Sequence, residues 1–149
     1  MEDDHLPKRR GQMSILFVCY GNACRSPMAE GLAKLVLGNS IRIESAGLIP
    51  ILSGATQEAV QVLQEHYGID ISQHQARSIT DIPISSFDRI VVLDAYVFGA
   101  LKNHYSTLAE RLILWDVEDP YGQDMRAFRK TAEILKTLIE NHLVPLLSG

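Results

Sequence analysis

Residues 18–27 constrain the fold of this chain more than any other stretch, because they lead from a buried strand into a helix. The run before them, residues 15–18, is continuously apolar, which is typical of a strand covered on both faces. The stretch after them, residues 28–37, has a helical pattern. Ser26 and Pro27 predict its start, an N-cap hydroxyl followed by a residue whose missing N–H costs nothing there. The loop between strand and helix must therefore lie at a helix N-terminus.

This loop has the composition of an anion-binding nest. Gly21 and Asn22 tolerate a positive φ, which lets successive backbone N–H groups curl around one centre. The dipole of the following helix adds partial positive charge at the same place. We therefore expect an oxyanion to be bound by the loop and the helix start, that is by Tyr20, Gly21, Asn22, Ala23, Cys24 and Ser26.

Cys19 and Arg25 bracket the loop with the spacing Cys-x5-Arg. Cys19 is expected at the floor of the nest, where the helix N-terminus, the amide donors and a nearby arginine all favour the thiolate. The planar guanidinium of Arg25 offers parallel donors that match two oxygens of a tetrahedral anion. The pair predicts a nucleophile beneath the anion and a bidentate clamp beside it. Ser26 is well placed to donate a hydrogen bond to the sulfur.

The remainder of the chain alternates strands and helices, which predicts an α/β fold with a doubly wound parallel sheet. In such a sheet the ligand lies at the carboxyl ends of the strands, where Cys19, Ser45, Asp94 and the loop of Asp119 would all emerge. The further strands are expected at residues 41–44, 88–94 and 111–115, and the further helices at residues 55–67, after Asp94 to about residue 102, and 125–143.

Length and charge limit the classes of protein to which the chain can belong. With 149 residues, we expect one domain over residues 13–149, preceded by a disordered extension over residues 1–12. The net charge of -4 argues against nucleic acid or an anionic membrane as the main partner. No apolar run approaches the roughly 18 residues of a membrane span, and the start lacks the features of a secretory signal. We expect a cytoplasmic protein.

Both cysteines of the chain lie in the loop, so neither a disulfide framework nor a zinc site is expected, and we predict no cofactor. Cys24 has two open interpretations. It either traps an oxidised Cys19 as a disulfide or is simply a small loop residue.

The pattern Val18-Cys19-x-Gly21-Asn22-x-Cys24-Arg25-Ser26-Pro27 resembles the signature of the low-molecular-weight protein tyrosine phosphatases. The resemblance extends from residue 14 to the C-terminal helix. It implies a three-layer fold with a four-stranded parallel sheet in the order 2-1-3-4. It also implies hydrolysis of phosphotyrosine in proteins through a phosphocysteine intermediate, with phosphorylated proteins and phosphate as partners and no metal.

Such a reaction needs a proton donor for the leaving oxygen and then a base for water. Asp119 is the candidate, because it precedes the stiffening Pro120 after a strand end and resembles the family's Asp-Pro-Tyr loop. Asp116 and Glu118 are competing carboxylates that spacing alone does not separate. The resemblance implies further roles for the substrate-pocket residues Ile51 and Tyr121 and for the supporting residues Ser45, His74, Arg77 and Asp94.

Three alternatives remain from the sequence. The segment Ser45-Ala46-Gly47 resembles the protein arginine phosphatase branch, but that branch carries Thr where this chain has Ala23. Arsenate reductases share the fold but need further redox cysteines, and none follows Cys24. The third alternative is a phosphate-binding module without turnover. Such a module does not need Cys19 or Asp119, so the presence of both residues argues against it.

Overall fold

The computed structural model describes residues 13–147, so the extension predicted for residues 1–12 lies outside the described residues. The strands are β1 (Ser14–Cys19), β2 (Arg42–Gly47), β3 (Arg89–Val92) and β4 (Leu112–Leu114). The helices are α1 (Arg25–Leu37), α2 (Gln57–Tyr67), α3 (Ala95–His104), α4 (Met125–His142) and α5 (Val144–Leu147).

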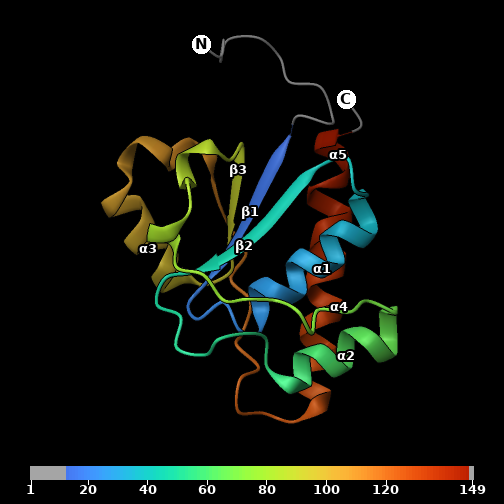
Figure 1. The fold of residues 1–149 in the computed structure, drawn as a ribbon. Coiled ribbons are helices and arrows are strands. Elements are labelled where there is room, and N and C mark those ends of the chain that lie inside the picture. The colour runs from blue at the N-terminus through green and yellow to red at the C-terminus, as the bar shows by residue number, and fades with distance from the viewer. Residues whose placement is uncertain (1–12, 148–149) are drawn as a thin grey trace.

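The strands form a single sheet in the order β2-β1-β3-β4, and every pairing is parallel. The α/β class and the strand order expected from the sequence are therefore confirmed. Helices α1, α2, α4 and α5 lie on one side of the sheet and α3 on the other (Figure 1). This gives three layers, with the carboxyl ends of the strands at one edge.

The central strand β1 explains why its apolar run is continuous. Ile15 and Phe17 point into the core beneath α1, α2 and α4, whereas Leu16 and Val18 point into the core beneath α3. Each is at most 1% exposed, as a strand buried on both faces requires. The same alternation brings Cys19 to the α1 side of the sheet at the carboxyl end of β1.

The start of α1 differs from the prediction. The helix begins at Arg25, its N-cap is Cys24, and no side chain caps it. Ser26 is the second helical residue, so its prediction as the N-cap is wrong. The hydroxyl is instead used inside the loop, where it meets the sulfur of Cys19. Leu35, one of the apolar residues in the helical pattern of residues 28–37, is 53% exposed.

The other helix ends follow local chemistry. The side chains of Thr56, Asp94 and Asp124 each accept a hydrogen bond from a backbone N–H in the first turn of α2, α3 and α4. Gly68 ends α2 in the left-handed conformation that its predicted cap position favours. Three 3-10 helices that the sequence did not indicate lie in the connections, at Ile79–Asp81, Ile84–Ser86 and Ser106–Arg111.

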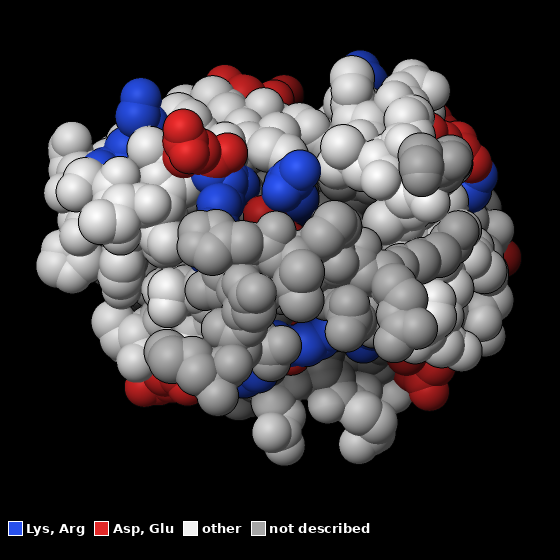
Figure 2. All heavy atoms as spheres, turned by 90° about the horizontal axis from the view of Figure 1, so that it is seen from above, with Lys and Arg blue, Asp and Glu red and all other residues white. Residues whose placement is uncertain are grey.

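Figure 2 looks onto the end of the molecule where the amino ends of the strands lie. Acidic and basic residues are interspersed on the described part of this face and do not form a continuous stripe of one sign. Among residues 13–147, no helix combines the length and apolar character needed to cross a membrane.

The last residue of β2 allows β2 to pass closely beneath the loop that follows β1. Gly47 pairs with Cys19, and its N–H donates to the carbonyl of Arg77 at 2.8 Å. A Cβ at this position would lie 2.8 Å from the amide nitrogen of Asn22 and 2.9 Å from the carbonyl carbon of Gly21. Both atoms are backbone, so a side chain here must displace the loop.

We therefore predict that Gly47→Ala lowers the free energy of unfolding by about 1–3 kcal/mol, the usual cost of overpacking. Gly99→Ala is the matched control, because nothing lies within 4 Å of the added Cβ and the residue is inside α3. The control should raise stability by up to about 1 kcal/mol, since alanine favours a helix. Urea unfolding of both variants measures this, and equal stabilities would contradict the close approach.

Candidate active site

The thiol of Cys19 lies at the floor of the loop, 2% exposed, and receives hydrogen bonds from two directions. The amide N–H of Asn22 donates to its sulfur at 3.3 Å, and the hydroxyl of Ser26 lies 2.9 Å from it. The Ser26 oxygen already accepts from the Asn22 side-chain amide at 2.8 Å, which leaves the hydroxyl hydrogen for the sulfur. The sulfur of Cys19 therefore lies within hydrogen-bond distance of two donors.

Asn22 is the residue that shapes the loop. Its φ of 55° is the only positive φ of a non-glycine residue in the described part of the chain. Its side-chain oxygen accepts from the backbone N–H of Arg77 at 2.9 Å, which orients the amide so that its nitrogen faces the two serines. That nitrogen donates to Ser26 and, at 3.1 Å, to Ser45. The backbone carbonyl of Asn22 accepts from the Nε2 of His74 at 3.0 Å.

The backbone carbonyls of the loop are bonded to the surrounding chain. Cys19 and Tyr20 accept from the N–H groups of Leu48 and Ile49, at 3.0 and 2.9 Å, and Ala23 accepts from Thr56 at 2.9 Å. In a trans peptide the C=O and the following N–H point in opposite directions. The carbonyl of Asn22 is bonded in the same way, to His74. The N–H group that follows each of these four carbonyls therefore points away from the surrounding chain, and together these N–H groups form a cradle for an anion. They belong to Tyr20, Gly21, Ala23 and Cys24.

The guanidinium of Arg25 is 4% exposed and is held from behind. Its Nη1 donates to Asp94 at 3.1 Å and to the carbonyls of Leu93 and Val117 at 3.1 and 3.0 Å. These acceptors lie directly after β3 and in the segment after β4. The other edge of the guanidinium is nearly free, because Nε is buried without a hydrogen-bond partner among the described residues.

The second nitrogen of that edge, Nη2, has one ion-pair partner, Asp119 at 3.5 Å. The Asp119 side chain is 47% exposed, and its Oδ1 accepts from the N–H of Tyr121 at 3.1 Å. The two nitrogens of this edge match two oxygens of a tetrahedral anion. The predicted clamp geometry of Arg25 is thus available.

A cavity of about 160 Å³ brings these groups together. Cys19, Arg25 and Asp119 line it together with apolar side chains, whereas Asp116 and Glu118 do not line it. The buried neighbours Trp115 and Val117 alternate with those two carboxylates, which turns both towards solvent. Of the three carboxylates, Asp119 is therefore the one that shares this cavity with the thiol. The remaining lining residues are Tyr20, Gly21, Ala23, Cys24, Ile49, Ile51, Leu52 and Tyr121.

A family model described as low molecular weight phosphotyrosine protein phosphatase matches residues 14–147. The chain belongs to this family. Family membership indicates a hydrolase that acts as a protein phosphatase and binds phosphorylated substrates and phosphate.

The names of similar proteins give two activities, tyrosine phosphatase and arsenate reductase. The chain is 35% identical over 131 residues to a probable low molecular weight protein-tyrosine-phosphatase EpsP of Ralstonia nicotianae, covering 83% of this chain and 88% of the relative. It is also 35% identical to arsenate reductase 1 of Staphylococcus epidermidis, over 85% and 92% of the two chains.

The solved structures that resemble this chain include a tyrosine phosphatase and an arginine phosphatase. The low molecular weight protein tyrosine phosphatase of T. tengcongensis superposes with a TM-score of 0.81 at 37% identity, covering 89% of this chain and 99% of that one. A YwlE arginine phosphatase superposes with a TM-score of 0.82 at 26% identity, over 92% and 97% of the chains.

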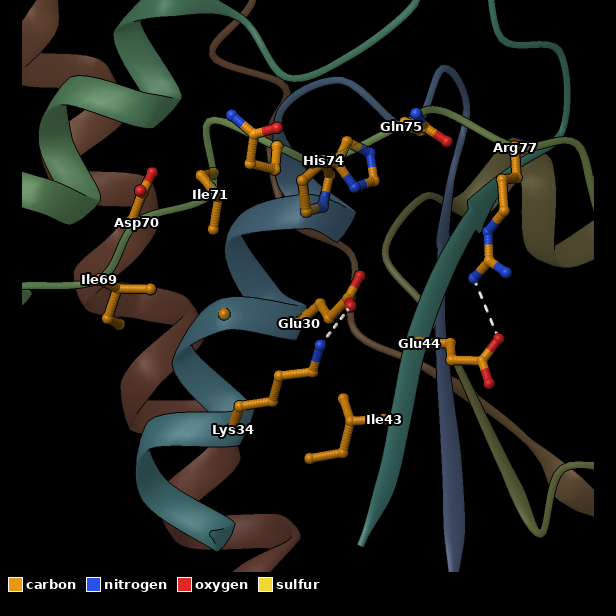
Figure 3. A pocket seen from close by; sticks show the side chains of 13 residues that line it. Glu30, Lys34, Ile43, Glu44, Ile69, Asp70, Ile71, His74, Gln75 and Arg77 are labelled. Atoms are coloured by element: carbon orange, nitrogen blue, oxygen red, sulfur yellow. Dashed lines mark hydrogen bonds and ion pairs between the residues drawn. The ribbon is translucent and has the colours of Figure 1, made fainter. Parts of the chain in front are cut away.

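Behind the phosphatase loop lies a second, larger hollow of about 530 Å³ (Figure 3). His74 and Arg77, which both hydrogen-bond to Asn22, line it, and so does Glu30. Glu30 accepts from Ser45 at 2.6 Å and pairs with Lys34 at 2.8 Å. The hydrogen bonds that brace the loop therefore continue to the wall of this hollow.

Arg77 also fixes the strand beside the loop. Its guanidinium donates to the carbonyl of Ser45 at 3.0 Å and to Glu44 at 3.1 Å. Burial acts to raise the pKa of Glu44, but the hydrogen bonds from Arg42 and Arg77 outweigh it and the pKa is lowered. Glu44 is thus a carboxylate at neutral pH, paired with two arginines.

Cys24 has a different environment from Cys19. It is 4% exposed, and its sulfur lies 3.5 Å from the hydroxyl of Thr56. Burial raises the pKa of the Cys24 thiol to about 11, although the Thr56 hydrogen bond lowers it. A thiol that stays protonated attacks slowly. This favours the second of the two interpretations, a small loop residue.

Reasoning from the sequence missed several contributors to the site. Nothing in the pattern of Glu30 distinguished it from a solvated helix carboxylate, and the carbonyls of Leu93 and Val117 have no sequence signal. Gly47 was noted only as part of a family resemblance, although its close approach to the loop requires glycine. No group of three or more His, Cys, Asp or Glu side chains suited to a metal ion occurs among the described residues.

The buried environment of Cys24 predicts a steep pH dependence of alkylation. With a pKa of about 11, the thiolate fraction at pH 7.5 is about 0.03% and rises tenfold per pH unit. Rates of iodoacetamide labelling in a Cys19→Ser variant, followed by mass spectrometry between pH 7 and 10, should therefore rise about tenfold per unit throughout. In urea the same rate should level off near pH 9. A plateau in the folded protein below pH 9 would contradict a shielded, protonated Cys24.

Proposed function

We propose that this chain hydrolyses phosphotyrosine in proteins through a phosphocysteine intermediate. The observation that carries the proposal is the convergence of three groups on one cavity. These are the hydrogen-bonded thiol of Cys19, the unpartnered Nε of Arg25 and the carboxylate of Asp119. A phosphoryl group seated in the loop would have a nucleophile below it, a guanidinium edge beside it and a proton donor facing its leaving oxygen.

In the first step the Cys19 thiolate attacks phosphorus. A sulfur–phosphorus bond forms, the bond from phosphorus to the tyrosine oxygen breaks, and protonated Asp119 gives its proton to the departing phenolate oxygen. The loop N–H groups and Arg25 stabilise the equatorial oxygens as charge spreads over them.

In the second step Asp119, now a carboxylate, takes a proton from water. The water oxygen attacks phosphorus, the sulfur–phosphorus bond breaks, and Cys19 returns as the thiolate while inorganic phosphate leaves. Ser26 and the Asn22 amide stabilise the thiolate as leaving group, because both donors already point at the sulfur. No metal is needed, since the cradle and Arg25 supply the positive charge.

The rim of the cavity supports an aromatic substrate. Tyr121, Ile51 and Ile49 line the cavity and are 59%, 83% and 52% exposed. They offer apolar walls to a ring held above the loop. Ser45, His74, Arg77 and Asp94 act as supports in this proposal, because each bonds to Asn22 or Arg25 rather than lining the cavity.

Hydrolysis of phosphoarginine is the second candidate, and the likeness to a YwlE arginine phosphatase favours it. The side chain at position 23 argues for phosphotyrosine. Ala23 lines the cavity, and its methyl group provides no hydroxyl for a guanidinium. Reduction of arsenate is less well supported despite the Staphylococcus relative, because the chain has only two cysteines and Cys24 stays protonated.

We further propose that the protein acts in the cytoplasm. Both cysteines are free, and a catalytic thiol needs a reducing environment to remain active.

The enzyme is tested by hydrolysis of para-nitrophenyl phosphate. We expect turnover that Cys19→Ser abolishes and that a metal chelator leaves unchanged, since the thiolate is the nucleophile. Phosphotyrosine and phosphoarginine peptides at matched concentration then decide the substrate, with the higher kcat/KM expected for phosphotyrosine. Binding of phosphate without any turnover would instead support a binding module.

The acid is tested by Asp119→Asn. We expect turnover of phenyl phosphate, which has a poor leaving group, to fall about 100-fold or more, because a positioned general acid contributes that much. The loss should be much smaller with para-nitrophenyl phosphate, whose leaving group needs little protonation. Glu118→Gln is the matched control, an exposed neighbouring carboxylate outside the cavity. Near-normal turnover of phenyl phosphate by Asp119→Asn would reject the assignment.

A further inference from the structure

An exposed aromatic residue lies beside the cavity without belonging to it. Tyr96 is the second residue of α3, and its side chain is 71% exposed. Its ring centroid is 6.4 Å from that of Tyr20, with the two planes tilted by 48°. Tyr20 lines the catalytic cavity and is itself 38% exposed. The pair thus continues the wall of the cavity onto the surface.

We propose that Tyr20 and Tyr96 form a subsite for an apolar or aromatic side chain flanking the phosphorylated residue of a protein substrate. This inference rests on the proposed phosphatase function, and it adds a contact that a small aryl phosphate cannot make. Tyr96 is the specificity-determining residue, because it contacts Tyr20 but does not itself line the cavity.

The distances suit a neighbouring residue of the same peptide. Consecutive Cα atoms of an extended chain are 3.8 Å apart, so a side chain one or two residues away spans the 6.4 Å between the Tyr20 and Tyr96 ring centroids. A phosphorylated side chain that enters the cavity brings the flanking chain across its rim. Tyr20 and Tyr96 then form one continuous surface from the cavity to the flanking residue.

The chemistry of the surface selects the occupant. Two tilted rings offer apolar faces and edges, to which leucine or phenylalanine side chains bind by burial of area and ring contact. Six large exposed apolar side chains surround the cavity or adjoin its wall: Tyr20, Ile49, Ile51, Leu52, Tyr96 and Tyr121. An apolar patch of this kind on a protein surface marks an interaction site.

The test uses two phosphotyrosine peptides that differ only in one residue next to the phosphotyrosine, leucine or serine. We expect the wild-type chain to prefer the leucine peptide in kcat/KM by about threefold to tenfold, the range for partial burial of a leucine side chain. Tyr96→Ala should remove this preference, and Tyr96→Phe should keep it. Each rate is normalised to hydrolysis of para-nitrophenyl phosphate by the same variant, which also reports folding.

Leu35→Ala is the matched control, an exposed apolar side chain on α1, and it should leave the preference unchanged. A preference that Tyr96→Ala retains, or equal rates for both peptides with the wild-type chain, would overturn the subsite. A lysine-flanked peptide that outperforms the leucine peptide would overturn its apolar character in favour of cation–π binding.

The same peptides are titrated against the Cys19→Ser chain and its Tyr96→Ala double variant, which separates the two proposals. If the wild-type chain hydrolyses neither peptide, the proposed function fails. The subsite is then tested by affinity alone: the Cys19→Ser chain should bind the leucine peptide more tightly, and the added Tyr96→Ala change should remove this preference. If the Cys19→Ser chain binds neither peptide, both proposals fail.

Discussion

The side-chain amide of Asn22 holds the loop after β1 in the conformation on which the rest of the site depends. A positive φ in a residue with a side chain is unfavourable unless its surroundings enforce it. Here the amide is fully buried and joins the start of α1, the end of β2 and the backbone at Arg77. Because the Ser26 oxygen accepts from this amide, the hydrogen of the Ser26 hydroxyl is left for the Cys19 sulfur. Asn22 thus contacts the sulfur directly through its backbone N–H and indirectly through Ser26.

Arg25 supplies the second constraint, a buried positive charge. Desolvation of a guanidinium is costly unless its donors are matched. Asp94 and two backbone carbonyls satisfy one nitrogen, and these acceptors lie just beyond two strands whose carboxyl ends meet at this edge. Asp94 also caps α3, so one carboxylate fixes both the arginine and the helix that carries Tyr96. The other edge of the guanidinium, formed by Nε and Nη2, is left for an anion and for Asp119. A chain of net negative charge can therefore still present a local positive charge to an anion.

The positions of strands and helices could be predicted from the sequence where local chemistry determines them. The continuous apolar run of β1 and the β-branched run of β3 follow from burial on both faces, and Gly68 ends α2 because a left-handed cap favours glycine. The failures have a common cause. Ser26 has the chemistry of an N-cap, but the buried amide of Asn22 and the Cys19 sulfur compete for its hydroxyl. Likewise Leu35 continues the apolar pattern of α1, yet its side chain is 53% exposed.

The amino-acid order alone determined the succession of strand, loop and helix, the cysteine and arginine at fixed spacing, and the family. These depend on neighbours in the chain, whose geometry short-range sterics and hydrogen bonds dictate. Only the tertiary structure decided which of three carboxylates lines the cavity with the thiol, which carbonyls hold Arg25, and that the rings of Tyr20 and Tyr96 lie close together. Those relations join residues far apart in sequence, and they arise because parallel packing brings the carboxyl ends of the strands to one edge.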